Sequence, residues 1–330
     1  MTMANFWVFV VIMAISFYVL LDGFDLGVGI LFGAVHDEAR RRQMLEAISP
    51  VWDGNETWLV MTGAVLFGAF PVVYSAVLSA FYLPICVMLA ALIMRGVAFE
   101  YRHHAIRLRG LWDTGFIVGS FLVSFIQGAA IGALSKGLPV INGQYVGSAF
   151  TWLSPFSALC GVGLSLGYAL LGAGWLIHKC EGDTRSFARR VFPYLLGCTF
   201  LVLIAVFAAA IVEHVTILQR WTQVSWRYIF PVVGTLATAS LLLIKRRLND
   251  VRPLLLTMLI FLCALGAFVV SFWPYMVPFS ITVAQAQAPA KSLGFMFWGI
   301  GVVVLPLTVA YTLTNYFVFR GKMKFGTRDS

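Results

Sequence analysis

Nine long apolar runs, separated by short connections, limit how this chain can fold. About 20 consecutive apolar residues are enough for a helix to cross the hydrocarbon core of a bilayer. Hydrophobic residues make up 60% of the chain and charged residues 11%, whereas soluble domains carry about 25% charged residues. The sequence therefore predicts an all-α polytopic membrane protein of nine transmembrane helices. The runs cover residues 6–35, 57–76, 78–99, 114–135, 153–178, 191–213, 228–245, 253–273 and 293–319.

The positions of lysine and arginine predict the orientation of these helices. Nineteen of the 23 basic residues fall in the connections after the first, third, fifth and seventh runs and in the C-terminal tail. By the positive-inside rule, the N-terminus is outside and the C-terminus inside, which requires an odd number of spans. The formal charge of +9 forms no continuous basic stripe, so no nucleic-acid partner is expected. The remaining basic residues are Lys136, Arg220, Arg227 and Lys291.

Two carboxylates, Asp22 and Asp25, interrupt the first apolar run. Their spacing of three residues places them on one face of a helix. If Phe6 marks the outer edge of the span, Asp22 lies roughly 24 Å along the helix axis. An ionised Asp near the middle of a bilayer costs about 2.5 to 3.5 kcal/mol, so such groups face a protein interior or a wet cavity. We therefore expect both acids to line a polar path.

A second polar motif, residues 52–58, lies at the start of the second apolar run. Two interpretations of this motif remain open. Asp53 and Glu56 fit a helix capping box, which needs no function. They also lie on the inner side, where they could join the two acids of the first run in a cluster of four carboxylates. In that cluster Asn55 is a neutral relay, and Trp52 and Trp58 lie at the interface.

The third and fourth runs contain further candidate polar residues. Arg95 lies in the last turns of the third run, where a long cation either reaches back to the inner interface or serves as counter-ion to a buried carboxylate. Glu100 follows as a candidate ion-pair residue. Asp113 is expected to be the N-cap of the fourth span, and Gln127 to form an interhelical hydrogen bond.

The second half of the chain looks like a faded copy of the first. Residues 18–26 can be aligned with residues 168–176, and Gly172 and Trp175 then replace the two acids. The basic loops that follow are both on the predicted inner side, as a parallel repeat requires. Any polar path is therefore expected in the first half only.

Histidines and cysteines predict no metal site and no directly ligated haem in this chain. A membrane b-type haem needs axial ligands that face a bundle interior, and every histidine falls in a loop or at the end of a run. The cysteines have no CxxC spacing. The residues concerned are His36, His103, His104, His178 and His214, and Cys86, Cys160, Cys180, Cys198 and Cys263.

Four motifs together resemble subunit II of the cytochrome bd-type quinol oxidases, and the match runs the whole length of the chain. Residues 22–27 and 52–55 are specific to that family, and residues 99–102 and 318–322 are supportive. The compact outer loops resemble the branch called cyanide-insensitive.

The resemblance implies two four-helix bundles plus one peripheral helix. Residues 1–135 then form the first bundle with the acidic cluster, and residues 136–275 form the second. Residues 276–330 supply the outer connection, the peripheral ninth helix and a basic cytoplasmic tail.

The resemblance also implies partners and cofactors. The expected partner is a haem-bearing subunit I, related by pseudo-symmetry, which holds two b-type haems and haem d and oxidises ubiquinol or menaquinol. A small single-span subunit, membrane lipids and quinone are further partners in such a complex. The complex lies in the bacterial cytoplasmic membrane, couples quinol oxidation to reduction of dioxygen to water, and generates proton-motive force.

Residue roles carried over from the resemblance concern protons and dioxygen. Asp25 and Asp53 are expected to line an inward-facing proton route, with Asp22 as an additional candidate and Asn55 and Glu56 beside them. Trp58 is a candidate lining residue of an apolar dioxygen channel. Two other functions remain open, namely a self-contained proton-coupled transporter and a purely structural membrane partner whose acids are satisfied by helix contacts.

Overall fold

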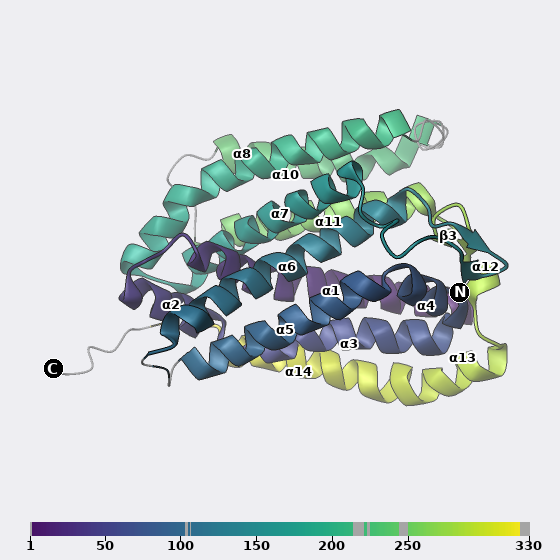
Figure 1. Cartoon of the computed structure of the whole chain (residues 1–330), viewed down its shortest axis with the longest axis horizontal. Helices are drawn as coiled ribbons and strands as arrows, with labels where there is room; N and C mark the ends of the chain where they lie inside the picture. Colours follow the sequence, from purple (N-terminus) through teal and green to yellow (C-terminus); the bar gives the residue numbers. More distant parts are fainter. Residues whose placement is uncertain are drawn as a thin grey trace.

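Long helices run side by side along the length of the molecule (Figure 1). The computed structural model describes residues 2–102, 105, 107–213, 221–222, 225–243 and 250–323. The first half contains α1 (Met3–Phe32), α2 (Glu38–Ile48), α3 (Trp52–Ala69), α4 (Pro71–Ala80), α5 (Tyr82–Arg102) and α6 (Arg109–Ser135). The second half contains α7 (Pro155–Lys179), α8 (Gly182–Glu213), the 3₁₀ helix η1 (Ser225–Tyr228), α10 (Ile229–Leu243) and α11 (Arg252–Phe272). The chain then continues through α12 (Val283–Ala286), α13 (Ala290–Met296), the π-helical η2 (Phe297–Val304) and α14 (Leu305–Val318).

Eight helices among the described residues are long and apolar enough to cross a membrane. The second predicted run, residues 57–76, is not one continuous helix, and that prediction was wrong in detail. Its residues belong to α3 and α4, which are separated at Phe70 (φ −136°, ψ 60°). The break has a local cause, because the residue before a proline is disfavoured in the α region and Pro71 is the first residue of α4.

Other helix ends also differ from the predicted runs. The connection at residues 36–50, predicted to be a loop, contains α2. Asp37 caps this helix by accepting from the Arg40 amide at 2.9 Å, and Met44, Leu45 and Ile48 are buried beneath it. α8 begins at Gly182, nine residues before the predicted start, because a stretch rich in charged residues continues the helix on the N-terminal side of the apolar run.

The two ends of the molecule are built differently. At one end lie α2 and the last described residues, and we call this the α2 end (Figure 1). The N-terminus lies at the other end, together with α12 and β3. Two antiparallel hairpins occur among the described residues, β1 (Val140–Ile141) with β2 (Gln144–Tyr145) and β3 (Tyr275–Val277) with β4 (Ile281–Thr282). The first turns at Asn142 and Gly143, both at positive φ, as a two-residue hairpin favours.

α1 lies at the centre of the molecule and packs against α3, α6 and α7. α1 and α7 touch through their backbones, because a Cβ atom added at Gly27 would lie 1.7 Å from the Tyr168 carbonyl oxygen. A Cβ atom added at Gly172 would lie 2.5 Å from the Gly27 carbonyl carbon. Small residues permit such close approach of membrane helices, and here they join the two halves of the chain. α8 and α10 form an outer layer on one side of the molecule, and α13 and α14 lie beside α3 on the opposite side (Figure 1).

Candidate functional site

Charged side chains are buried together between α1, α3 and α5, and we call this group the acid cluster. Its members are Asp22, Asp25, Asn55, Glu56 and Arg95. Asp22 and Asp25 are fully buried, and Asn55 and Arg95 are each 1% exposed. The Glu56 side chain is 28% exposed. The structure thus brings together residues that lie up to 73 positions apart in sequence.

Arg95 is the cation of the acid cluster. Its Nη1 donates to Glu56 Oε1 at 2.8 Å and lies 3.4 Å from Asp22 Oδ1. Of the two interpretations of Arg95, the snorkelling one is wrong, because the side chain points inward and is buried. Removing one partner from a buried ion pair costs about 3 to 5 kcal/mol, since it leaves an uncompensated charge.

Asp25 is held by a neutral side chain. The Asn55 Nδ2 donates to Asp25 Oδ2 at 2.7 Å. The Asn55 Oδ1 in turn accepts from the Tyr316 hydroxyl at 3.0 Å. Tyr316 lies on α14, so the last helix of the chain reaches the acid cluster. Sequence reasoning missed this residue, because an aromatic belt near the end of a last span is a generic feature.

A second polar chain approaches Asp22 from α6 and α7. The Tyr168 hydroxyl donates to Gln127 Oε1 at 2.9 Å, and Gln127 Nε2 donates to the Tyr18 hydroxyl at 2.6 Å. Tyr18 lies one turn before Asp22 on α1. The interhelical hydrogen bond predicted for Gln127 is confirmed. Both tyrosines were missed as site residues, although each belongs to the aligned repeat segments.

The acid cluster retains unused hydrogen-bonding capacity. Asp22 Oδ2 and Asp25 Oδ1 have no hydrogen-bond partner within the described part of the chain, and neither do Arg95 Nε and Nη2. Buried polar atoms are normally satisfied by protein or by water. The three carboxyl groups also outnumber the one guanidinium, so full ionisation would leave excess negative charge in a low-dielectric interior.

The remaining predicted site residues lie around the cluster. Asp53 is exposed in the first turn of α3, whose N-cap is Val51. The capping-box interpretation is therefore wrong, and Asp53 makes no side-chain contact to the cluster among the described hydrogen bonds. Glu100 is exposed on α5 and takes part in no described ion pair of the cluster.

The two tryptophans of the second motif pack differently. Trp52 is half-buried and packs on Phe99 with ring centroids 5.1 Å apart. Trp58 is fully buried between α1 and α3 and stacks on Phe17 at 4.5 Å. Trp52 is thus next to the α2 end, whereas Trp58 lies deeper in the apolar packing.

A separate ion network ties α2 to α5 and α6. Arg102 binds Asp113 and also donates to both Glu38 oxygens, at 3.2 and 2.8 Å. Arg41 Nη1 donates to Asp113 at 2.6 Å. The expected N-cap role of Asp113 was wrong, because α6 begins four residues earlier at Arg109. Burial raises the pKa of Glu38, but the Arg102 hydrogen bonds and the charges of Arg102 and Arg109 outweigh it and lower the pKa overall.

Residues 319–322, near the end of the described part of the chain, contact α7 and the Asp250 ion pairs at the α2 end. Asp250 binds Arg185 and accepts from Arg189 at 3.0 Å and from Lys322 at 2.6 Å. Partial burial raises the pKa of Asp250, whereas the Lys322 hydrogen bond and the three positive charges outweigh it, so the pKa is lowered. Lys179 donates to the backbone carbonyls of Phe319 and Gly321. We call this group the tail clip.

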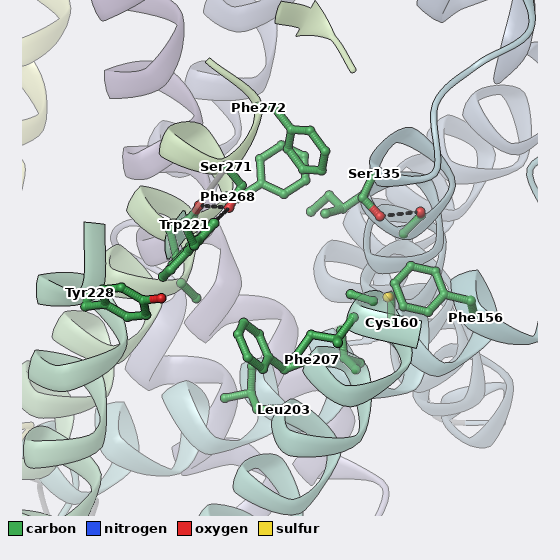
Figure 2. Close-up of a pocket in the computed structure, with 17 residues that line it drawn as sticks. Ser135, Phe156, Cys160, Leu203, Phe207, Trp221, Tyr228, Phe268, Ser271 and Phe272 are labelled. Atoms are coloured by element: carbon green, nitrogen blue, oxygen red, sulfur yellow. Dashed lines mark hydrogen bonds between the residues drawn. The ribbon is translucent and has the colours of Figure 1, made fainter. Parts of the chain in front are cut away.

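A partly open apolar cavity of about 330 Å³ lies mainly in the second half, between α7, α8 and α11, with α6 of the first half on one side. Figure 2 shows aromatic side chains from several elements around it, with Trp221 donating to Ser271 Oγ at 2.9 Å. No charged side chain lines this cavity in the described part of the chain. Its aromatic lining residues are Phe156, Phe207, Trp221, Tyr228, Phe268 and Phe272.

The described histidines do not fit a haem site. His36 is exposed, and His178 lies half-buried near the end of α7. His103, His104 and His214 lie outside the described residues. Within those residues, no group of three or more His, Cys, Asp or Glu side chains could hold a metal ion.

These features define a class: a polytopic helical membrane protein with a charged centre in one half and an apolar cavity in the other. A solved structure, that of bd oxidase from Geobacillus thermodenitrificans, has the same fold with a TM-score of 0.73. The match covers 97% of this chain and 99% of that chain at 17% sequence identity.

Two curated relatives are similar over nearly their full lengths. Cytochrome bd-I ubiquinol oxidase subunit 2 of Escherichia coli strain K12 is 29% identical, with 96% of this chain and 94% of the relative covered. Cytochrome bd ubiquinol oxidase subunit 2 of Bacillus subtilis strain 168 is 27% identical, with 96% and 95% covered. The family description "Cytochrome bd terminal oxidase subunit II" matches residues 3–319. The chain belongs to this family and is a multi-pass protein of a bacterial membrane.

Proposed function

We propose that this chain is the subunit II of a bd-type quinol oxidase that lines a proton route from the cytoplasm through its acid cluster. The observation that carries the proposal is two carboxyl groups that share one guanidinium, with the carboxyl group of Asp25 on the next turn of α1, and an oxygen without a hydrogen-bond partner in the described part of the chain on each buried aspartate. Such a group takes up or releases a proton with little rearrangement, because Asp22 and Glu56 already share one counter-ion. Reduction of dioxygen to water consumes protons, and this subunit delivers them without ligating a haem.

The proposed topology has nine spans, with the N-terminus outside and the C-terminus inside. The broken pair α3 and α4 then counts as the second span, beside the eight continuous ones. The α2 end becomes the cytoplasmic end. Its support is the cluster of described basic residues there, in α2, at the start of α8 and near the end of the chain. The two proposed four-helix bundles meet at the α1–α7 contact.

The proposed route enters at the exposed face of α3. Asp53 and the partly exposed Glu56 lie within one turn of each other at the α2 end. Glu56 shares Arg95 with Asp22, and Asn55 links the same helix to Asp25. The route thus passes from the partly exposed Glu56 through Arg95 to Asp22, and Asn55 connects α3 to Asp25 beside it.

The redox chemistry belongs to a partner. The family resemblance assigns two b-type haems and haem d to subunit I, and the described histidines of this chain, exposed His36 and half-buried His178 near the end of α7, are consistent with that assignment. Quinol is the electron donor, as the relatives' names state for ubiquinol. The chain also scaffolds subunit I, and the complex generates proton-motive force by drawing protons for water formation from the cytoplasm. Trp58, buried beside Phe17, is the proposed lining residue for dioxygen.

The test compares acid-to-amide variants in complexes that retain all haems. We expect Asp25→Asn and Asp22→Asn to lower oxygen consumption strongly while the reduced-minus-oxidised spectrum is unchanged. Asp183→Asn is the matched control, because Asp183 is 84% exposed and pairs loosely with Arg40 at 4.0 Å. Undiminished turnover in both cluster variants would leave a scaffolding role only. A purified complex without haem bands would instead favour a transporter.

A further inference from the structure

Tyr316 is held against the acid cluster by two aromatic neighbours. Its ring meets Phe24 edge to face with centroids 6.5 Å apart, and Trp175 at 6.1 Å. Phe24 and Trp175 are themselves stacked at 4.1 Å, and Trp175 Nε1 donates to the Ala47 carbonyl oxygen. The ring position of Tyr316 is therefore fixed by packing on α1 and α7, independently of its hydroxyl group.

The hydroxyl group of Tyr316 supports the orientation of the Asn55 amide in which the NH₂ group faces Asp25. An ionised carboxylate only accepts hydrogen bonds, so the Asn55 NH₂ must face Asp25 whenever Asp25 is ionised. The Asn55 carbonyl oxygen then points away and needs a donor, and the Tyr316 hydroxyl supplies it at 3.0 Å. The reversed amide would present its oxygen to Asp25, which an ionised carboxylate disfavours.

We propose that Tyr316 is a positioning residue for proton transfer at Asp25, acting through the orientation of the Asn55 side chain. This inference rests on the proposed function of Asp25. It gives the last helix of the chain a part in the proton site, in addition to a peripheral packing role. Because Asp25 Oδ1 has no partner within the described residues, Asn55 is the contact that orients this carboxyl group.

The hydroxyl group can be removed without removing the ring. In Tyr316→Phe the contacts to Phe24 and Trp175 remain, and only the hydrogen bond to Asn55 is lost. The net value of one such hydrogen bond corresponds to roughly a two- to tenfold effect. We therefore expect a two- to tenfold lower kcat for oxygen consumption, with haem content and the KM for quinol unchanged.

Two controls on the same helix separate this effect from general damage to α14. Tyr311→Phe makes the same chemical change at an exposed tyrosine. Asn315→Ala removes the adjacent hydrogen bond from α14 to the Pro50 carbonyl oxygen and leaves Asn55 untouched. Both variants are expected to keep the parental kcat.

A spectroscopic signature and a double-mutant cycle test the route through Asn55. The infrared carboxyl band that disappears in Asp25→Asn is expected to shift in Tyr316→Phe and to stay in place in Tyr311→Phe. If Tyr316 acts through Asn55, then Tyr316→Phe adds no further loss in an Asn55→Ala background.

The outcomes distinguish this inference from the proposed function. Full turnover in Asp25→Asn overturns the proposed function. Lost turnover in Asp25→Asn, combined with unchanged kcat and an unshifted band in Tyr316→Phe, overturns the positioning role alone. Additive losses in the double variant overturn it as well, because they assign Tyr316 an effect that does not pass through Asn55.

Discussion

The two halves of this protein contain helices that can be aligned in sequence, but the aligned positions are acidic in the first half and uncharged in the second. α1 carries Asp22 and Asp25 into the acid cluster, whereas the aligned positions of α7 are Gly172 and Trp175. Among the described residues of α7 to α11, the one buried charged side chain is Lys179, at the end of α7. The second half instead supplies most of the lining of the apolar cavity (Figure 2).

This difference indicates that helix α7 of the second half packs against α1 and so helps to position the acid cluster of the first half. Gly172 allows the α1 backbone to approach α7 closely. Trp175 packs on Phe24, in the turn that separates the two acids, and also contacts Tyr316. The positions that are acidic in α1 are therefore packing residues in α7. Their contacts hold α1, which carries the two acids, in place.

The largest expected effect comes from breaking the contact between the halves. Gly172→Ala places a Cβ atom 2.5 Å from the Gly27 backbone, and backbone atoms cannot move aside as a flexible side chain can. We expect the complex to lose assembly, measured as haem per purified complex. Gly197→Ala is the control, because no atom lies within 4 Å of its added Cβ. Normal haem content in Gly172→Ala would show that the two halves need no close contact.

Removing the cation of the acid cluster is expected to have the next largest effect. Arg95→Leu leaves Asp22 and Glu56 without their counter-ion, at a cost of about 3 to 5 kcal/mol. The thermal unfolding temperature of the complex measures this loss. Adding Asp22→Asn to Arg95→Leu is expected to recover part of it, because the two residues are coupled. If the unfolding temperature of the double variant fell by the sum of the two single-variant decreases, the pairing of Arg95 with Asp22 would be contradicted.

A hydrogen bond at the apolar cavity is expected to matter for stability but not for turnover. Ser271→Ala removes the acceptor of the Trp221 indole N–H, at a cost of about 0.5 to 1.5 kcal/mol. Oxygen consumption per haem is expected to equal that of the parent. A lower rate per haem in this variant would mean that proton chemistry is not confined to the first half.

The ion pairs of the tail clip are expected to make the protein slightly less stable to unfolding as the pH falls into the acid range. The folded-state pKa of Asp250 is lowered by Lys322, Arg185 and Arg189. Its ion pairs therefore contribute fully above the unfolded pKa, about 3.9, and are lost as the pH falls through the lower folded value. The effect is about 1 kcal/mol or less, because exposed pairs are weak. Asp250→Asn should flatten this part of the profile of unfolding temperature against pH.

Much of the architecture followed from local sequence patterns. Apolar runs predict membrane helices because length and composition alone decide whether a segment can cross a bilayer. The spacing of Asp22 and Asp25 predicts a shared face, and both are buried, with Asp22 in contact with Arg95 of α5 and Asp25 with Asn55 of α3. Phe70 shows the limit of this approach, because a run of apolar residues hides a break that one proline causes.

The contacts that complete the site could not be predicted in this way. Asn55 and Tyr316 lie 261 positions apart, and no local pattern pairs them. Asp113 fitted an N-cap by its place near a run, yet Arg102 and Arg41 bind it inside α6. Partners of a polar residue depend on how helices pack together, which a single sequence does not determine.

Proton uptake during the reaction of the reduced complex with dioxygen tests the central claim most directly. The complex is reconstituted into vesicles with a pH indicator on the side of the α2 end, and haem oxidation is followed in the same sample. For Asp25→Asn with full haem content, the account predicts that proton uptake from that side slows together with the oxidation steps that depend on it. Uptake at the parental rate from the same side would contradict the claim that the acid cluster carries these protons.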